Sequence, residues 1–316
     1  MIRIENLTKY YGSFRALDQI NFQVQDGEIL GFLGPNGAGK TTTMQIMTSY
    51  LAPSEGNIFV DDYNVIEDSF EIRNNLGYLP EHNPLYEDMI VYDFLKFVAK
   101  MRKIDDNLIK DRIKEVIEVC GLKRVIHREI GVLSKGYKQR VGLAQAIIHD
   151  PSILILDEPT SGLDPNQIAE IRELIKTLGK KKTVLISSHI LQEIQATADR
   201  MVIINEGKIA ADGTLDELMA KFRGDTLLEM ELKNADEKKL ESISEIDNKI
   251  KIVEIDDSKE GAKLKLEYPN TIDPREEIFE FAVNNEWKIL EMSRSRTSLE
   301  DVFRKLTVEQ GGSNEN

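Results

Sequence analysis

Residues 34–42, GPNGAGKTT, constrain the fold more than any other stretch of this sequence of 316 residues. They match the spacing G-x-x-x-x-G-K-[ST], in which glycines let backbone N–H groups approach a phosphate closely. The apolar segment 28–33, EILGFL, precedes them and predicts a buried strand, and a helical pattern follows up to Tyr50. This order of strand, glycine-rich loop and helix predicts an α/β fold with a phosphate-binding loop, and it disfavours a purely structural glycine turn.

The loop offers several groups to a phosphate ligand. Backbone N–H groups can surround phosphate oxygens at the start of the helix, where the helix dipole favours an anion. We expect the Lys40 ammonium to reach the β- and γ-phosphates and the Thr41 hydroxyl to bind Mg²⁺. The predicted contacts are Gly34, Pro35, Asn36, Gly37, Ala38, Gly39, Lys40, Thr41 and Thr42.

Two adjacent carboxylates follow another strand signal, in ILILDEP at 153–159. Asp157 and Glu158 come directly after the apolar run, where open α/β sheets bind their ligands. Taken alone, such a pair more often belongs to a turn with a helix cap. The phosphate-binding loop upstream favours a functional interpretation, with Asp157 as a ligand of Mg²⁺ and Glu158 as the base that activates water.

Strand and helix patterns alternate through the first two thirds of the chain, which predicts a mostly parallel sheet. Period-two alternation near the N-terminus predicts antiparallel strands with one buried face. Helical periodicity dominates from about 86 to 150. The expected later elements are a strand at 152–157, a helix at 166–179, a strand at 183–188, a helix to 198 and a hairpin turning at Glu206-Gly207.

The C-terminal third differs in charge, since acidic residues outnumber basic ones by 23 to 14 from Asp225 onward. A glycine and polar residues at 221–225 favour a domain boundary there. We predict domains at 1–221 and 222–308 and a disordered tail at 309–316. The second domain shows a βαββαβ order typical of a ferredoxin-like α+β fold. Its expected elements are strands at 226–232, 249–255, 262–268 and 287–292 and helices at 236–243, 274–285 and 298–306.

Composition narrows the class of protein. Hydrophobic residues make up 41% and charged residues 30% of the chain, which is typical of a globular protein. No apolar run approaches the about 20 residues that span a bilayer, and the N-terminus lacks the apolar block of a signal peptide, so we expect a cytoplasmic protein. The net charge of −14 argues against a nucleic-acid binder. The single Cys120 fits a small buried residue better than a catalytic thiol.

With these motifs in hand, residues 1–220 resemble the nucleotide-binding subunit of an ABC (ATP-binding cassette) transporter. LSKGYKQR at 133–140 is similar to the family's signature motif LSGGQ. The resemblance implies that Ser134 and Gly136 bind the γ-phosphate of ATP held by the opposite subunit of a head-to-tail dimer. The expected ligands are therefore ATP and Mg²⁺, and the first expected partner is a second copy of the chain.

The same resemblance assigns further residues. Tyr11 is similar to the aromatic residue that stacks on adenine, although Tyr10 is adjacent and a buried strand tyrosine is the alternative. Asp164, in SGLD, matches the D-loop that crosses the dimer interface. His189 matches the switch histidine that contacts the γ-phosphate, although a lone histidine after a strand is usually structural.

Two departures from the family pattern bear on turnover. Glu81 stands where the family usually has the glutamine of its Q-loop; an ionised glutamate can bind a metal but cannot donate a hydrogen bond as an amide does. It resembles a recurrent variant of exporter-type members. Lys135 and Tyr137 replace Gly and Gln of the signature, while Ser134 and Gly136 remain. We expect the dimer site to stay competent.

The family's helical subdomain, expected here at about 82–140, receives a coupling segment of a membrane permease beside the Q-loop. The acidic C-terminal domain resembles that of ATPases serving ABC-2 type exporters at the cytoplasmic face of the membrane. Within this group the motifs are most similar to gliding-motility ATP-binding subunits. Two alternatives stay open: a soluble ABC protein acting on a macromolecular complex, and a module that binds ATP without turnover.

Overall fold

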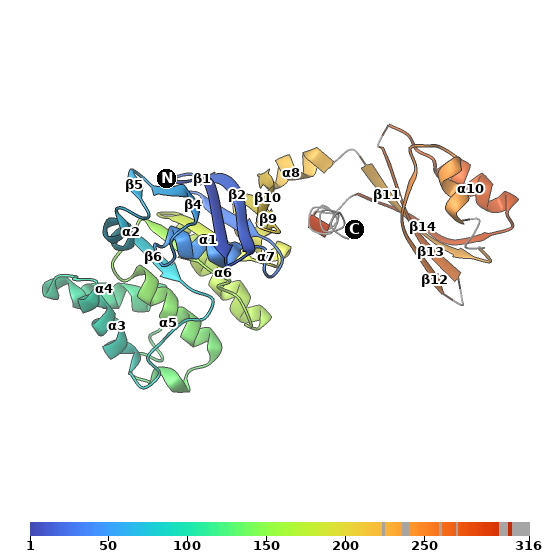
Figure 1. Ribbon diagram of the computed structural model, residues 1–316. Helices are drawn as coiled ribbons and strands as arrows, with labels where there is room; N and C mark the ends of the chain where they lie inside the picture. Colours follow the sequence, from blue (N-terminus) through green and yellow to red (C-terminus); the bar gives the residue numbers. More distant parts are fainter. Residues whose placement is uncertain (223–224, 236–239, 259–260, 270, 297–302, 305–316) are drawn as a thin grey trace. The chain divides into compact units, whose positions relative to one another are not determined.

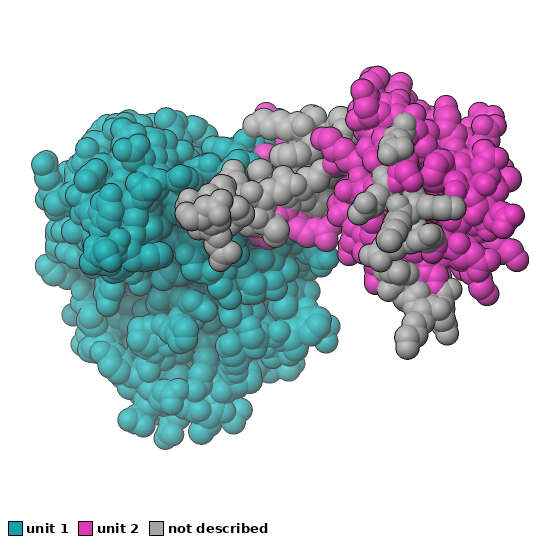
Figure 2. Space-filling view, turned by 45° about the vertical axis from the view of Figure 1, so that its right-hand side comes forward, with its two compact units in different colours: residues 1–215, 310–316 teal, residues 216–309 magenta. Residues whose placement is uncertain are grey.

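The computed structural model describes residues 1–222, 225–235, 240–258, 261–269, 271–296 and 303–304. The chain divides between Leu215 and Asp216 into two compact units, which Figure 2 shows in different colours. This division falls after the first residue of helix α8 (Leu215–Phe222), whereas the predicted boundary at 221/222 lies at the end of that helix. The predictions for 298–302, 305–306 and the tail at 309–316, and most of the predicted helix at 236–243, fall outside the described residues.

A six-stranded sheet forms the centre of the first unit (Figure 1). Its strand order is β10-β9-β3-β8-β7-β6, and all neighbours are parallel except the β9–β10 hairpin. The predicted mostly parallel core is confirmed. Both residues of the hairpin turn, Glu206 and Gly207, have positive φ, as a two-residue turn that follows the strand twist requires. The strands are β3 (Ile29–Leu33), β6 (Leu76–Leu79), β7 (Ile153–Leu156), β8 (Thr183–Ser188), β9 (Arg200–Asn205) and β10 (Lys208–Gly213).

A second sheet of the same unit is antiparallel, as the N-terminal alternation predicts, and has the order β2-β1-β4-β5. Its apolar side chains and those of the parallel sheet form one core, in which Phe22 stacks on Phe32. The sequence patterns missed β4, β5 and α2. The elements are β1 (Ile2–Tyr11), β2 (Phe14–Val24), β4 (Glu55–Val60), β5 (Tyr63–Asn64) and α2 (Ser69–Asn75).

Three helices, α3, α4 and α5, contact one another and form the helical subdomain (Figure 1). Cys120 caps α4 and is buried, as predicted. Helices α1 and α7 are shorter than expected from the patterns and end at Met47 and Gln195. No helix in the described ranges has the length and apolar character to cross a bilayer. The helices are α1 (Lys40–Met47), α3 (Val91–Met101), α4 (Asp106–Val119), α5 (Lys135–Ile147), α6 (Pro165–Gly179) and α7 (Leu191–Gln195).

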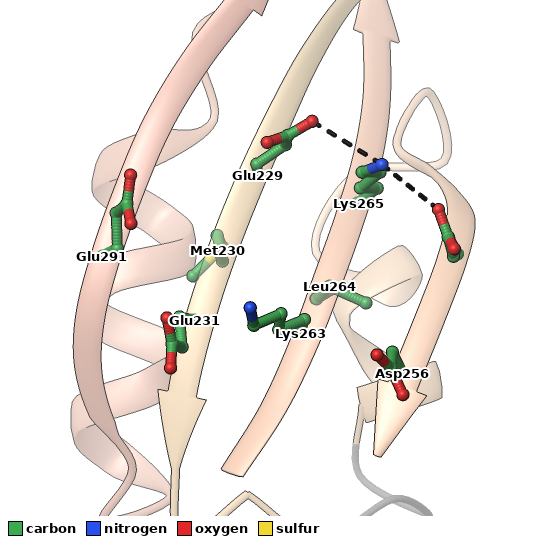
Figure 3. A pocket seen from close by; sticks show the side chains of 9 residues that line it. Glu229, Met230, Glu231, Asp256, Lys263, Leu264, Lys265 and Glu291 are labelled. Carbon is green, nitrogen blue, oxygen red and sulfur yellow. Dashed lines mark ion pairs between the residues drawn. The ribbon is translucent and has the colours of Figure 1, made fainter. Parts of the chain in front are cut away.

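The second unit has one antiparallel sheet in the order β12-β13-β11-β14, which is the order of a ferredoxin-like βαββαβ fold and confirms that prediction. The unit also contains helix α10 and a short 3₁₀ helix, Glu241–Glu245. Trp287 and Tyr268 are buried in the apolar core of the unit. On the exposed face of the sheet, Lys265 Nζ forms ion pairs with Glu229 Oε1, at 3.7 Å, and with Glu254 Oε2, at 3.3 Å (Figure 3). The elements are β11 (Asp225–Lys233), β12 (Lys251–Ser258), β13 (Gly261–Pro269), α10 (Arg275–Asn284) and β14 (Lys288–Arg296).

Candidate nucleotide-binding site

A cleft of about 490 Å³ opens beyond the carboxyl ends of β3, β6, β7 and β8. Side chains that follow each of these four strands converge on it, because parallel strands end at one edge of the sheet. Most of the predicted site residues line this one cleft. They are Tyr11, Asn36, Gly37, Gly39, Lys40, Thr41, Thr42, Glu81, Glu158 and His189, joined by Phe14, Ala16 and Ser161.

The loop between β3 and α1 depends on glycine at defined positions. Gly37 and Gly39 have φ of 81° and 109°, a region that side chains disfavour. At Gly39 the neighbours also exclude a side chain, since a Cβ would lie 2.6 Å from Leu17 Cδ2. The Ala38 N–H donates to the Pro35 carbonyl, so the loop closes a turn just before α1 begins at Lys40.

Lys40 is buried, and its ammonium is held inside the loop. Nζ donates to the carbonyl oxygens of Gly34, at 2.8 Å, and Pro35, at 3.2 Å. It also lies 3.3 Å from Oε1 of Glu158. The Lys40 ammonium therefore holds a buried positive charge at the cleft, where an anionic ligand could replace the carbonyl oxygens as its hydrogen-bond acceptor.

Asp157 is fully buried at the end of β7. Its Oδ1 accepts a hydrogen bond from Ser187 Oγ at 2.6 Å, and its Oδ2 has no hydrogen-bond partner among the described residues. Burial raises the pKa of this carboxyl, and the Ser187 hydrogen bond opposes the rise. The Glu158 N–H donates to the same Ser187 oxygen, so β8 orients the Asp157 carboxylate and holds the Glu158 backbone.

Glu158 connects the loop with His189. Its Oε2 lies 3.0 Å from His189 Nδ1, while its Oε1 faces Lys40. The residue has φ of 46°, a left-handed conformation that a non-glycine residue adopts at a cost. The Glu158 side chain is only 7% exposed, whereas His189 is 41% exposed. The pair therefore places a buried carboxylate behind an accessible imidazole.

Tyr11 and Phe14 form an aromatic wall at one side of the cleft. They are 47% and 64% exposed, which excludes the buried strand tyrosine considered for Tyr11. Lys9 Nζ lies 5.6 Å from the Tyr11 ring centroid and supports the ring by a cation–π contact. The neighbouring Tyr10 is also exposed but does not line the cleft.

Ser134 and Gly136 lie elsewhere, in a separate hollow of about 430 Å³. The Ser134 hydroxyl caps α5 by accepting from the Tyr137 N–H at 3.5 Å. Gly136 packs on Gln167 of α6, whose N–H donates to Asp164 Oδ1 at 2.9 Å. Asp164 therefore caps α6 beside the signature residues, and the structure does not bring these three residues to Lys40 within one chain.

Comparisons with known proteins decide the family. A model described as ABC transporter matches residues 17–161, and one described as the C-terminal domain of DrrA1-3-like ATP-binding proteins matches residues 213–307. The bacitracin transport ATP-binding protein of Bacillus licheniformis is 36% identical over 308 residues, which are 97% of each chain. The chain belongs to the ABC transporter ATP-binding proteins.

Other relatives of this ABC protein agree. The linearmycin resistance ATP-binding protein of Bacillus subtilis is 34% identical over 75% of this chain and 76% of its own. A solved bacterial ABC transporter cassette, reported as a dimer, superposes with a TM-score of 0.63 at 25% identity, covering 68% of this chain and 99% of its own. The predicted P-loop ATPase fold is confirmed, and the ABC protein is an ATPase.

Sequence reasoning missed several residues of this ABC ATPase site. Phe14 has no motif around it, and Ser187 is a strand residue whose hydrogen-bond partners, Asp157 and Glu158, lie about 30 positions earlier in the sequence. Glu193 accepts hydrogen bonds from Thr160 and Ser188 at 2.6 and 2.9 Å and fixes the segments after β7 and β8. The one local signal is that Ser187 and Ser188 directly precede His189.

Proposed function

We propose that two copies of this ABC ATPase assemble head to tail around two Mg·ATP and power an ABC-2 type exporter. The proposal rests on one observation: each chain has two separate half-sites, the cleft at Lys40 and the hollow at Ser134. The cleft at Lys40 and the hollow at Ser134 share none of the described residues that line them. In a head-to-tail dimer, Ser134 and Gly136 of one copy would contact the γ-phosphate in the other copy's cleft, and Asp164 would cross the interface.

The residues present fit Mg²⁺. The buried Asp157 Oδ2 lacks a partner among the described groups, and a carboxylate oxygen is a ligand that Mg²⁺ prefers. Asp157 and the Thr41 hydroxyl would hold the ion, with Glu81 as a further oxygen ligand at the cleft. When bound, Mg²⁺ neutralises part of the phosphate charge.

The chain's own groups account for hydrolysis. Tyr11 and Phe14 would stack on the adenine, and Lys40 would exchange carbonyl oxygens for phosphate oxygens. Glu158 would take the proton of the attacking water, while His189 would orient the Glu158 carboxylate and contact the γ-phosphate. The contacts of Glu158 with Lys40 and His189 support this role because they hold both carboxylate oxygens in place.

A permease would bind at the helical subdomain. A groove of about 610 Å³ there is lined by Pro84, which follows Glu81 by three residues, and by Gln145 of α5, the helix that begins at the signature. One loop and one helix thus join the groove to both half-sites. Closure of the dimer would move them together and switch the permease between two states. We place the complex at the cytoplasmic face of the membrane.

The relatives' names support an exporter of drugs, since one serves bacitracin transport and another linearmycin resistance. The similarity to gliding-motility subunits stays a prediction from motif residues alone. Capture of the tagged chain from gently solubilised membranes tests the class of function. A multi-pass membrane protein in fixed ratio supports the exporter, whereas ribosomal or DNA-repair proteins would favour the soluble alternative.

Light scattering tests the composite site. A Glu158→Gln chain should bind ATP, hydrolyse it slower by about 10²-fold or more, and form a dimer only with ATP. Adding Lys40→Ala or Ser134→Ala to that background should abolish the dimer. An equimolar mixture of the two double variants should dimerise again, since one cleft and one signature remain intact in the mixed pair.

Two results would reject the proposed assembly. The Glu158→Gln chain could stay monomeric with ATP, which would rule out the ATP dimer. The parent could dimerise while the mixture does not, which would show that the two half-sites do not complete each other. Circular dichroism of each variant serves as the control for folding.

A further inference from the structure

Helix α5 begins with a cation and has no carboxylate at its start. Lys135 is the first residue, the N-cap is Ser134, and the first turn contains no acidic residue. A cation at this end opposes the helix dipole, which favours an anion there. Among the α-helices in the described ranges, only α1 shares this arrangement: it begins at Lys40 and also lacks a carboxylate in its cap and first turn. The start of α5 therefore matches that of the helix behind the phosphate-binding loop.

Lys135 differs from the other cations of the signature segment. Lys138 pairs with Glu87 at 2.6 Å, and Arg140 pairs with Glu170. The Lys135 side chain is exposed, and its ammonium has no hydrogen-bond or ion-pair partner among the described residues. A cation that opposes the helix dipole and has no partner within the chain suits an anion that comes from outside the chain.

Packing directs the Lys135 side chain toward the loop that ends at Asp164. A Cβ at Gly162 would lie 2.1 Å from Lys135 Nζ, so the ammonium occupies space that only a glycine leaves open. Gly162 also has φ of 68°, which favours glycine at this position. The ammonium thus lies where the signature residues Ser134 and Gly136 meet the loop of Asp164. These are the two segments that the proposed dimer brings to the other copy's cleft.

We propose that Lys135 binds the γ-phosphate of the ATP held in the other copy's cleft and acts there as a second catalytic lysine. The inference rests on the proposed function and adds a group that the family's signature motif lacks, because Lys135 replaces a glycine of LSGGQ. Lys40 would approach the phosphate from the copy that holds the ATP, and Lys135 from the opposite copy.

The added charge acts on hydrolysis as follows. The water oxygen bonds to the γ-phosphorus, the bond from phosphorus to the bridging oxygen of ADP breaks, and Glu158 takes the proton of the water. Negative charge on the phosphoryl oxygens and the bridging oxygen is stabilised by nearby cations during this step. Because Lys135 would contact only the γ-phosphate, it should favour ATP and leave the binding of ADP to a single chain unaffected.

Mixed pairs test whether the contact is made across the dimer. In the Glu158→Gln background, a Lys40→Ala copy and a Ser134→Ala copy together form one competent site, from the cleft of the second and the signature of the first. Lys135→Met on the Lys40→Ala copy should raise the ATP concentration for half-maximal dimerisation, measured by light scattering, by about tenfold or more. The same substitution on the Ser134→Ala copy, whose signature is already inactive, should cause no shift.

The single variant separates catalysis from folding. Lys135→Met in the otherwise unmodified chain should lower kcat for ATP hydrolysis by about tenfold or more, with the affinity of the monomer for ADP unchanged. Its free energy of unfolding in urea should not fall, since the substitution removes a cation from the positive end of α5. Lys110→Met, at an exposed lysine of α4, is the matched control and should change none of these quantities.

Several results would overturn the inference while the ATP dimer of the Glu158→Gln chain stands. Lys135→Met could cause no shift on either copy, or it could cause the larger shift on the Ser134→Ala copy, which would show that the lysine acts within its own chain through Gly162. Equal shifts on both copies with a lower free energy of unfolding would assign a structural role. If the Glu158→Gln chain forms no dimer with ATP, the proposed assembly fails as well.

Discussion

Position 39 excludes any residue but glycine for two separate reasons, whereas position 37 has only one. Both backbones are left-handed, but a Cβ at Gly39 meets Leu17 and Ala16, while nothing lies within 4 Å of one at Gly37. We expect Gly37→Ala to lower the free energy of unfolding by about 1–2 kcal/mol, from backbone strain. Gly39→Ala should lower the free energy of unfolding by about 1–3 kcal/mol more than Gly37→Ala does, because the new methyl group overpacks the site. Urea unfolding compares them, and equal losses would show that the loop relaxes around the new methyl group.

His149 makes the stability of the chain sensitive to acid. Burial and the nearby Arg102 lower its pKa to about 4. Its Nε2 lies 3.2 Å from the Leu76 carbonyl, and its buried Nδ1 has no partner among the described residues for a second proton. The unfolded chain therefore binds this proton below pH about 6.5, and the folded chain only below about 4.

Stability from this group is complete above pH about 6.5 and falls as the pH drops through the window to about 4. We expect a loss of about 2 kcal/mol, discounted because the imidazole is partly exposed. Urea unfolding at pH 7 and pH 4.5 measures it. His149→Leu should remove this part of the pH dependence, and an unchanged difference between the two pH values would contradict the assignment.

At the scale of elements, helix α5 lies close to the loop that follows β6. A Cβ at Gly142 would lie 1.8 Å from Asn83 Nδ2, which donates to the Lys138 carbonyl oxygen at 3.3 Å. Gly142→Ala should therefore lower the free energy of unfolding by about 1–3 kcal/mol. Asn83→Ala added to it should restore part of this loss, because the nearer obstructing side chain is gone while Leu79 Cδ1, 2.8 Å from the Cβ, remains. A double-mutant cycle by urea unfolding measures the coupling, and strictly additive losses would contradict the close contact.

The elements that were predicted well from the sequence have a uniform pattern of burial along their length. β7 and β8 have apolar centres and are buried along their whole length, and their ends place Asp157 and His189 where the motifs required. β4, β5 and α2 were missed because exposed and buried positions mix along them, so their sequences show no regular apolar period. Contacts such as Ser187 with Asp157 depend on which strands become neighbours, and no spacing in the chain records that.

At the scale of the whole molecule, the two units have separate apolar cores. We expect calorimetry to show two unfolding transitions. ATP with Mg²⁺ should raise only the one that belongs to the nucleotide-binding unit. Trp287→Ala should destabilise the other by about 3–5 kcal/mol, because the indole fills the core of the C-terminal unit. A single transition that responds to both changes would show that the units unfold together.

Cys120 allows local opening of the helical subdomain to be measured by thiol labelling. It is the chain's one cysteine, and burial raises the pKa of its thiol to about 12. The thiolate is the nucleophile that attacks thiol reagents, so the native protein should stay unlabelled, whereas any opening of α4 exposes the thiol to the reagent. The rate at which the unmodified chain is labelled thus measures local opening at Cys120. A cysteine introduced at the groove or the cleft would be labelled while Cys120 stays unlabelled.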